Sequence, residues 1–123
     1  MAKQPNAAME ALWQASKGLM MPSETDAPFE VIRLEGEPTP LGLRKLARAP
    51  KDATVEEATL DSLFLTVPSE DKTKFQKLGL AIESQLSGIK VYKVGDEAER
   101  QVFIVGKAAD GQWVGLRTVV VET

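Results

Sequence analysis

The loop Ser23–Asp26 carries the side chains of this sequence that are best suited to binding chemistry. It places two carboxylates and two hydroxyls within four residues, between Pro22 and Pro28. Prolines on both sides favour a rigid loop, and a preorganised acid loses less entropy when it docks against a cation on a partner. The competing interpretation is a solvated turn in which Ser23 or Asp26 makes local hydrogen bonds. The composition of the loop does not choose between them.

Cysteine and histidine are absent from the chain. Their absence excludes the nucleophile–imidazole pairs of common hydrolases, zinc sites built from thiolate and imidazole, and any disulfide. Carboxylates, lysines or Tyr92 remain available, since glycosidases need only two acids. The sequence has no glycine-rich phosphate loop of the common patterns. We therefore expect no cofactor and no enzymatic activity, and a carboxylate enzyme remains the third hypothesis behind two kinds of partner-binding protein.

The net charge of −3 comes from 18 acidic and 15 basic side chains. A general DNA mimic would carry a much larger acidic excess, because duplex DNA bears one charge about every 1.7 Å of axis. A protein that binds nucleic acid would be distinctly basic. We therefore expect no direct contact with nucleic acid, and any electrostatic recognition must be local.

The chain of 123 residues suits a single domain, residues 1–123, with its own hydrophobic core. No apolar run approaches the roughly 20 residues that span a bilayer. The first five residues, Met1 to Pro5, lack the apolar centre of a secretory signal. We expect a cytoplasmic protein that does not contact membranes and is a monomer when free.

The elements that must position the loop are predicted from periodicity and turn residues. Asn6 can cap a first helix that ends at Gly18, and apolar residues then continue to Met21. The remaining elements of the first half are a strand over Phe29–Leu34, a helix over Leu41–Ala49 that Thr39 and Pro40 begin, and a weaker strand over Ala53–Thr59.

Two further helices are predicted before the last third of the chain. Asp61 or Ser62 can cap a helical turn that runs to Phe64. Ser69 is the predicted cap of a longer helix that ends at Gly88. Its apolar face is formed by Phe75, Leu78, Ile82 and Leu86.

Three strands are predicted at the C-terminal end: Ile89–Val94, Gln101–Val105 and Trp113–Val121, with a tight hairpin turn at Asp110-Gly111 between the last two. Apolar residues occupy both faces of these strands, whereas an antiparallel sheet with one wet face alternates apolar and polar residues. Both faces should therefore be covered. With helices from both halves of the chain, the sequence predicts a three-layer α/β/α sandwich with a largely antiparallel central sheet.

Three stretches of the chain resemble the nuclease A inhibitor family, in the same order and with the same chain end. They are ALWQASKGLMMPSETDAPFEVIRLEG (11–36), KFQKL (74–78) and VYKVGDEAERQVFIVGKAADGQWVGLRTVVVET (91–123). The resemblance implies an α/β/α sandwich that inhibits a sugar-nonspecific DNA/RNA endonuclease. Such an endonuclease uses a single active-site Mg²⁺.

The resemblance also implies which residues bind the nuclease. In the family, a loop glutamate reaches the Mg²⁺ of the nuclease and the C-terminal threonine lies close by, which corresponds to Glu24 and Thr123 here. Mg²⁺ takes oxygen ligands and keeps several waters, so a carboxylate on a stiff loop can replace the scissile phosphate. The predicted partner-binding site consists of Ser23, Glu24, Thr25, Asp26, Glu122 and Thr123.

One segment departs from the family pattern. The family carries a longer acidic and aromatic segment ahead of the Lys-Phe-Gln-Lys-Leu run, and that segment helps to contact the nuclease. Here only residues 67–71 stand there, without an aromatic side chain. Since a standard interface buries about 1,600 Å², the missing contacts would weaken binding or change the partner. The alternative hypothesis is therefore a protein-interaction module of the same fold that has lost or changed its nuclease target.

Other candidate residues have more ordinary interpretations. Glu70 and Asp71 fit acids favoured before a helix by its dipole. The basic cluster of Arg44, Lys45, Arg48 and Lys51 fits a solvated amphipathic helix. Trp113 fits the edge of the core, whereas Trp13 is as well suited to an interface as to the core.

Overall fold

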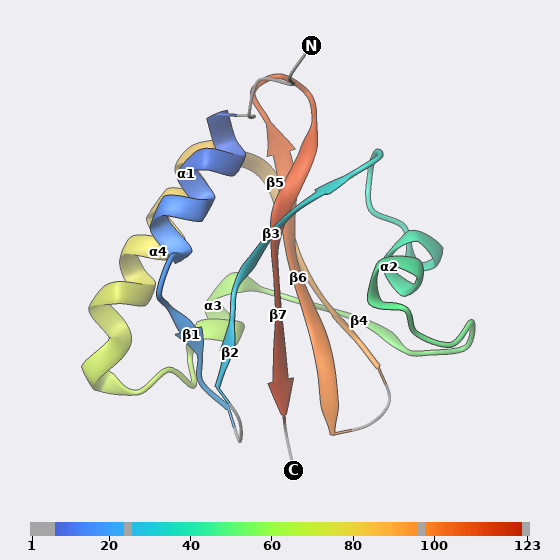
Figure 1. Ribbon diagram of the computed structural model, residues 1–123, viewed down its shortest axis with the longest axis horizontal. Helices are drawn as coiled ribbons and strands as arrows, with labels where there is room; N and C mark the ends of the chain where they lie inside the picture. Colours follow the sequence, from blue (N-terminus) through green and yellow to red (C-terminus); the bar gives the residue numbers. More distant parts are fainter. Residues whose placement is uncertain (1–6, 24–25, 96–97, 122–123) are drawn as a thin grey trace.

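A computed structural model describes residues 7–23, 26–95 and 98–121 (Figure 1). The described part contains four α-helices, a short 3-10 helix, a two-stranded sheet and a five-stranded sheet. All pairings in the larger sheet are antiparallel, and its strand order is β3-β7-β6-β5-β4. The predicted mixed α/β class and the antiparallel sheet are confirmed. The strands of this sheet are β3 (Glu30–Leu34), β4 (Val55–Ala58), β5 (Leu86–Val94), β6 (Glu99–Ala108) and β7 (Trp113–Val121).

Helices pack against the strands in two separate apolar clusters. The larger cluster joins α1 (Ala7–Ser16), α3 (Leu60–Phe64) and α4 (Lys72–Gln85) to the sheet, with Leu12 and Ile82 fully buried. The smaller cluster joins α2 (Pro40–Ala47) to the sheet through Leu43. In Figure 1, α1 and α4 lie on the left of the strands and α2 lies on the right.

Strand β6 contributes side chains to both clusters, as its sequence predicts. Val102 and Ile104 belong to the larger cluster, whereas Phe103 and Val105 belong to the smaller one. Phe103 is fully buried and is the largest side chain with almost no exposed surface. The apolar character of both strand faces therefore reflects burial on both sides.

The start of α2 follows its sequence signal closely. The backbone N–H of Gly42 donates to Thr39 Oγ1 at 3.0 Å, and Pro40 occupies the first turn, where a missing N–H costs nothing. The helix ends at Ala47, and Arg48 caps it with a left-handed backbone of φ 56°. The predicted boundaries of this helix are confirmed to within two residues.

Two predicted helix caps are wrong. The cap of α3 is Thr59, which accepts from the N–H of Ser62 at 3.1 Å while Ser62 Oγ accepts from the N–H of Thr59 at 3.3 Å. Thr59 has the extended backbone that a cap requires. Ser69 does not cap the long helix, because Ser69–Asp71 already forms a 3-10 turn (η1) and α4 begins at Lys72.

The predicted end of the long helix at Gly88 is also wrong. The helix ends at Gln85, and Leu86 starts β5 by pairing with Ala108. Gly88 lies within the strand with φ of 59°, where the pairing register shifts between Ser87 and Lys90. Glycine tolerates this left-handed backbone, so it marks a bulge in the strand rather than a helix end.

Candidate functional site

The acidic loop is carried by a small β-hairpin that the sequence did not predict. Strands β1 (Met20–Met21) and β2 (Ala27–Pro28) pair antiparallel, with Met20 opposite Pro28. The side chain of Met21 is 1% exposed and belongs to the larger core cluster. Met21 therefore anchors one arm of the hairpin in the core, and pairing with β1 holds the other arm beside it. Strands of two residues have no measurable periodicity, which is why the sequence pattern missed them.

The predicted site is described only in part. Ser23 and Asp26 are described, and the side chain of Asp26 is exposed. Glu24, Thr25, Glu122 and Thr123 lie outside the described residues, so their predicted roles remain predictions.

A hydrogen bond joins the two described edges of the predicted site. The backbone N–H of Val121 donates to Ser23 Oγ at 3.0 Å, across 98 residues of sequence. Ser23 begins the acidic loop, and Val121 ends β7 two residues before the end of the printed sequence. The hairpin and the end of β7 both lie at the lower end of the molecule in Figure 1. The fold thus brings the loop and the C-terminal strand together.

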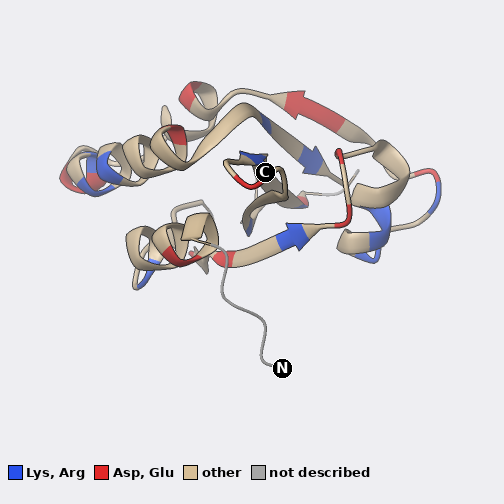
Figure 2. Ribbon diagram, turned by 90° about the horizontal axis from the view of Figure 1, so that it is seen from above, with Lys and Arg blue, Asp and Glu red and all other residues tan. Residues whose placement is uncertain are grey.

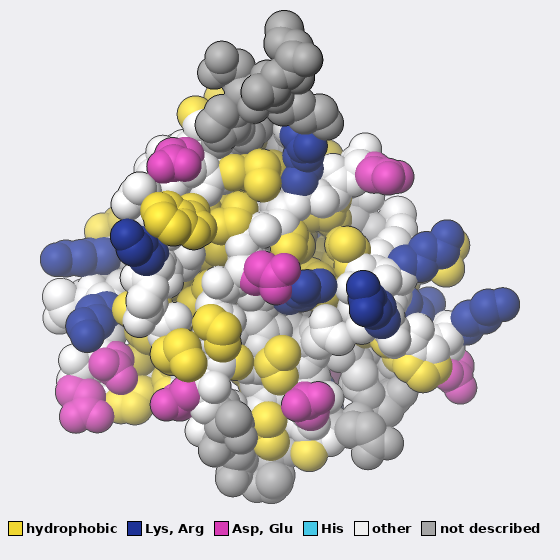
Figure 3. Space-filling view, in the orientation of Figure 1, with side chains coloured by type: hydrophobic (Ala, Val, Ile, Leu, Met, Phe, Trp, Pro, Cys, Tyr) yellow, Lys and Arg dark blue, Asp and Glu magenta, His cyan; other side chains and the backbone are white. Residues whose placement is uncertain are grey.

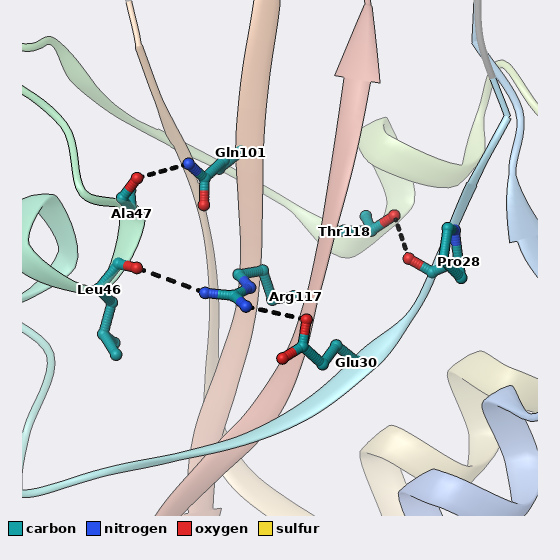
Figure 4. A network of polar contacts seen from close by, with 7 residues as sticks. All are labelled: Pro28, Glu30, Leu46, Ala47, Gln101, Arg117 and Thr118. Carbon is teal, nitrogen blue, oxygen red and sulfur yellow. Dashed lines mark hydrogen bonds and ion pairs between the residues drawn. The ribbon is translucent and has the colours of Figure 1, made fainter.

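A second hydroxyl fastens the other arm of the hairpin. Thr118 Oγ1 donates to the carbonyl oxygen of Pro28 at 3.0 Å and lies 3.4 Å from that of Ala27 (Figure 4). Thr118 is 3% exposed, so this polar group is buried with its partner in place. Sequence analysis missed Thr118, because a threonine within a strand is ordinarily explained by its high β propensity.

A hollow of about 390 Å³ adjoins the contact between the loop and β7. Its wall combines the hairpin, the end of β7, α3 with the residues that follow it, and β5. The lining includes Pro22, Ser23, Thr66, Pro68, Lys93 and Val121. The short segment 67–71 therefore lies beside the predicted site through Pro68. Glu70 and Asp71 stand directly before α4, in the position predicted for acids that the helix dipole favours.

Large apolar side chains are exposed on the hairpin that carries the loop and on α1. Met20 is 46% exposed and Trp13 is 47% exposed, with Lys17 Nζ 4.9 Å from the Trp13 ring centroid. Figure 3 shows apolar side chains gathered over this part of the molecule. Trp113, by contrast, is half-buried at the start of β7.

On the other side of the sheet, polar side chains hold α2 in place (Figure 4). Gln101 Nε2 donates to the carbonyl oxygen of Ala47 at 2.6 Å, and Arg117 Nη1 donates to that of Leu46 at 3.3 Å. Arg117 also pairs with Glu30 at 2.8 Å. These contacts satisfy carbonyls at the C-terminal end of the helix.

The basic cluster of the second helix has a structural use. Arg44 Nε donates to the carbonyl oxygen of Ala53 at 2.7 Å, which ties the helix to the segment before β4. Figure 2, which colours the ribbon by residue type, shows basic and acidic residues distributed over several elements. This supports the interpretation of the cluster as an ordinary helix surface.

The described residues offer neither a metal site of clustered acids nor a membrane-spanning helix. Within residues 7–23, 26–95 and 98–121, no group of three or more acidic side chains is arranged to hold a metal ion. Among the helices of the same ranges, none combines the length and apolar character needed to cross a membrane.

Comparison with known proteins places the chain in a family. A model of the family NuiA, described as nuclease A inhibitor-like protein, matches residues 6–123. Because the match covers nearly the whole chain, the chain belongs to this family, and the resemblance noted in its sequence is confirmed. No curated protein matches it. The family consists of nuclease inhibitors rather than enzymes, so the carboxylate-enzyme hypothesis is dropped.

Proposed function

We propose that the chain inhibits a Mg²⁺-dependent, sugar-nonspecific DNA/RNA endonuclease by placing the loop Ser23–Asp26 and the C-terminal residues in its active site. The observation that carries the proposal is the hydrogen bond from the Val121 N–H to Ser23 Oγ. It ties the start of the acidic loop to the strand that leads to the chain end. Membership of the nuclease A inhibitor-like family supplies the partner class.

The carboxylate of Glu24 is the group proposed to reach the Mg²⁺ of the nuclease. Mg²⁺ prefers oxygen ligands at short distances and gives up its waters reluctantly. A carboxylate can therefore take the position of the scissile phosphate, while the Thr123 hydroxyl and carboxylate bond to metal-bound water. Thr25, Asp26 and Glu122 complete the polar surface around this contact. The near balance of 18 acidic and 15 basic side chains supports binding to a protein rather than to nucleic acid.

The surroundings of the loop suit a protein partner. Met20 exposes an apolar side chain on the hairpin that carries the loop, and the neighbouring hollow offers a concave surface. Interfaces typically combine such apolar centres with polar rims. Segment 67–71 lies beside this hollow through Pro68, so differences in that segment would act directly on partner contacts.

We also infer that residues 1–123 form one domain with three layers, monomeric when free. Two core clusters support this arrangement, one joining α1, α3 and α4 to the sheet and the other joining α2 to it. Strand β7, which follows β3 in the order of the five-stranded sheet, bonds to Ser23 at the start of the loop. A rigid support of this kind lowers the entropic cost of inserting one carboxylate into an active site.

Glu24→Ala tests the proposed role of the loop. The substitution should weaken binding to the nuclease by about 2–5 kcal/mol, the range for truncating one partner of a buried charge pair. Inhibition of DNA cleavage by such an endonuclease, titrated at fixed Mg²⁺, measures the change. The matched control is Glu37→Ala, which removes an exposed acid that follows the C-terminal end of β3, whereas β2 precedes the N-terminal end of that strand.

The outcomes separate the two hypotheses. Full inhibition by Glu24→Ala would remove Glu24 from the mechanism. A wild-type chain that binds and inhibits no endonuclease of this class, including any encoded in its own genome, would contradict the inhibitor proposal. Recovery of a partner without nuclease activity would then favour the interaction module with a changed target.

A further inference from the structure

Strand β7 leaves part of one edge without a strand neighbour from the five-stranded sheet. On that edge β3 pairs with β7 only between Trp113 and Arg117. The stretch from Thr118 to Val121 extends beyond the start of β3 at Glu30. Unpaired strand edges expose backbone donors and acceptors that need other partners.

Two side-chain hydroxyls, one on β7 and one on the hairpin, join the hairpin to this stretch of β7. Thr118 Oγ1 donates to the Pro28 carbonyl on β2 at 3.0 Å, and the Val121 N–H donates to Ser23 Oγ at 3.0 Å. One bond holds each side of the acidic loop. An isolated hairpin of two strands is marginally stable at best, so a hairpin with two residues in each strand depends on such external bonds.

We propose that Thr118 is a positioning residue for nuclease binding: its buried hydroxyl holds β2 against β7 and so sets the loop Ser23–Asp26 relative to the chain end. The inference rests on the proposed function and adds a residue that lies outside the loop and the last two residues. Its side chain is 3% exposed, so Thr118 acts through the hairpin rather than by touching the partner.

The substitution Thr118→Val removes the hydroxyl and keeps the shape of the side chain. We expect the affinity for the nuclease to fall roughly three- to tenfold, the change that corresponds to the loss of one typical hydrogen bond. Thr118→Ser keeps the hydroxyl, so this variant should retain most of the wild-type affinity. Gln101→Met is the matched control, because it removes a hydrogen bond to α2 at Ala47 instead. It should lower the free energy of unfolding without changing the affinity.

A double-mutant cycle distinguishes positioning from a general loss of stability. If Thr118 acts by placing the loop, Thr118→Val should cost much less affinity in the Glu24→Ala background than in the wild-type chain. Equal fold-losses in both backgrounds, or a loss of the same size in Gln101→Met, would overturn the proposal.

Amide hydrogen exchange in the free protein tests the positioning step without any nuclease. Thr118→Val should speed exchange at Met21 and Val121, on the hairpin and at the end of β7, and leave α2 protected. Unchanged exchange there would refute the positioning role even if inhibition falls. If the wild-type chain inhibits no nuclease but exchange responds as expected, the inhibitor proposal fails while the placement of the loop by Thr118 stands.

Discussion

Replacing Ser23 by alanine removes the acceptor that holds the end of β7. The Val121 N–H donates to Ser23 Oγ at 3.0 Å, and both residues are half-buried. A typical intramolecular hydrogen bond contributes about 0.5–1.5 kcal/mol net, and a fully buried orphaned donor costs more. Water can reach a half-buried N–H, so we expect Ser23→Ala to lower the free energy of unfolding by about 1 kcal/mol.

The same substitution at Ser84 is the matched control. Ser84 Oγ donates to the carbonyl oxygen of Ala81 at 3.0 Å, within the exposed side of α4. That bond duplicates what the helix already supplies, and alanine has the higher helix propensity by about 0.5 kcal/mol. Ser84→Ala should therefore leave stability unchanged or raise it slightly. Both variants lose one hydroxyl and one hydrogen bond of similar length.

Urea unfolding measures the free energies, and a nuclease titration measures inhibition. We expect Ser23→Ala to be less stable than Ser84→Ala and to inhibit more weakly. Equal stability of the two variants would show that the hydroxyl of Ser23 does not hold the C-terminal strand. Equal inhibition would show that this hydrogen bond is irrelevant to the partner surface.

Two further substitutions test the packing that supports the site, each by urea or thermal unfolding. Gly115→Ala should lower the free energy of unfolding by about 3 kcal/mol, because the added Cβ would collide with the Ile104 carbonyl oxygen and lie 2.9 Å from Val105 Cα. Its control, Gly79→Ala in α4, should add about 0.5–1 kcal/mol, and a destabilised control would contradict the argument. Thr39→Ala should cost about 1 kcal/mol through the lost cap of α2, so an unchanged unfolding midpoint would refute that assignment.

Elements with strong local signals were predictable from the sequence. Thr39 and Pro40 mark the start of α2, because the cap hydroxyl and the missing proline N–H both act within one turn. Asp110 and Gly111 mark the last hairpin, where the Gln112 N–H donates to Asp110 Oδ1 at 3.0 Å. These interactions join residues at most three apart, so their chemistry is visible without the fold.

Elements that depend on distant contacts were not predictable in this way. Leu86 continues the apolar spacing of α4, yet it starts β5 because pairing with Ala108 outweighs one more helical turn. The β1–β2 hairpin has no local pattern, since its two-residue strands are held by β7 through Thr118. In both cases the deciding partner lies far along the chain.

The sequence by itself determined three things: which side-chain chemistry is absent, which family the chain belongs to, and where the locally capped elements begin. Without cysteine or histidine, thiolate and imidazole chemistry is impossible in any fold. Only the tertiary structure brought Ser23 to Val121, across 98 residues. That contact arises because β3 pairs with β7 only as far as Arg117, and the hairpin lies beside the rest of β7. There the Ser23 hydroxyl accepts from the Val121 N–H, and the Thr118 hydroxyl donates to the Pro28 carbonyl oxygen.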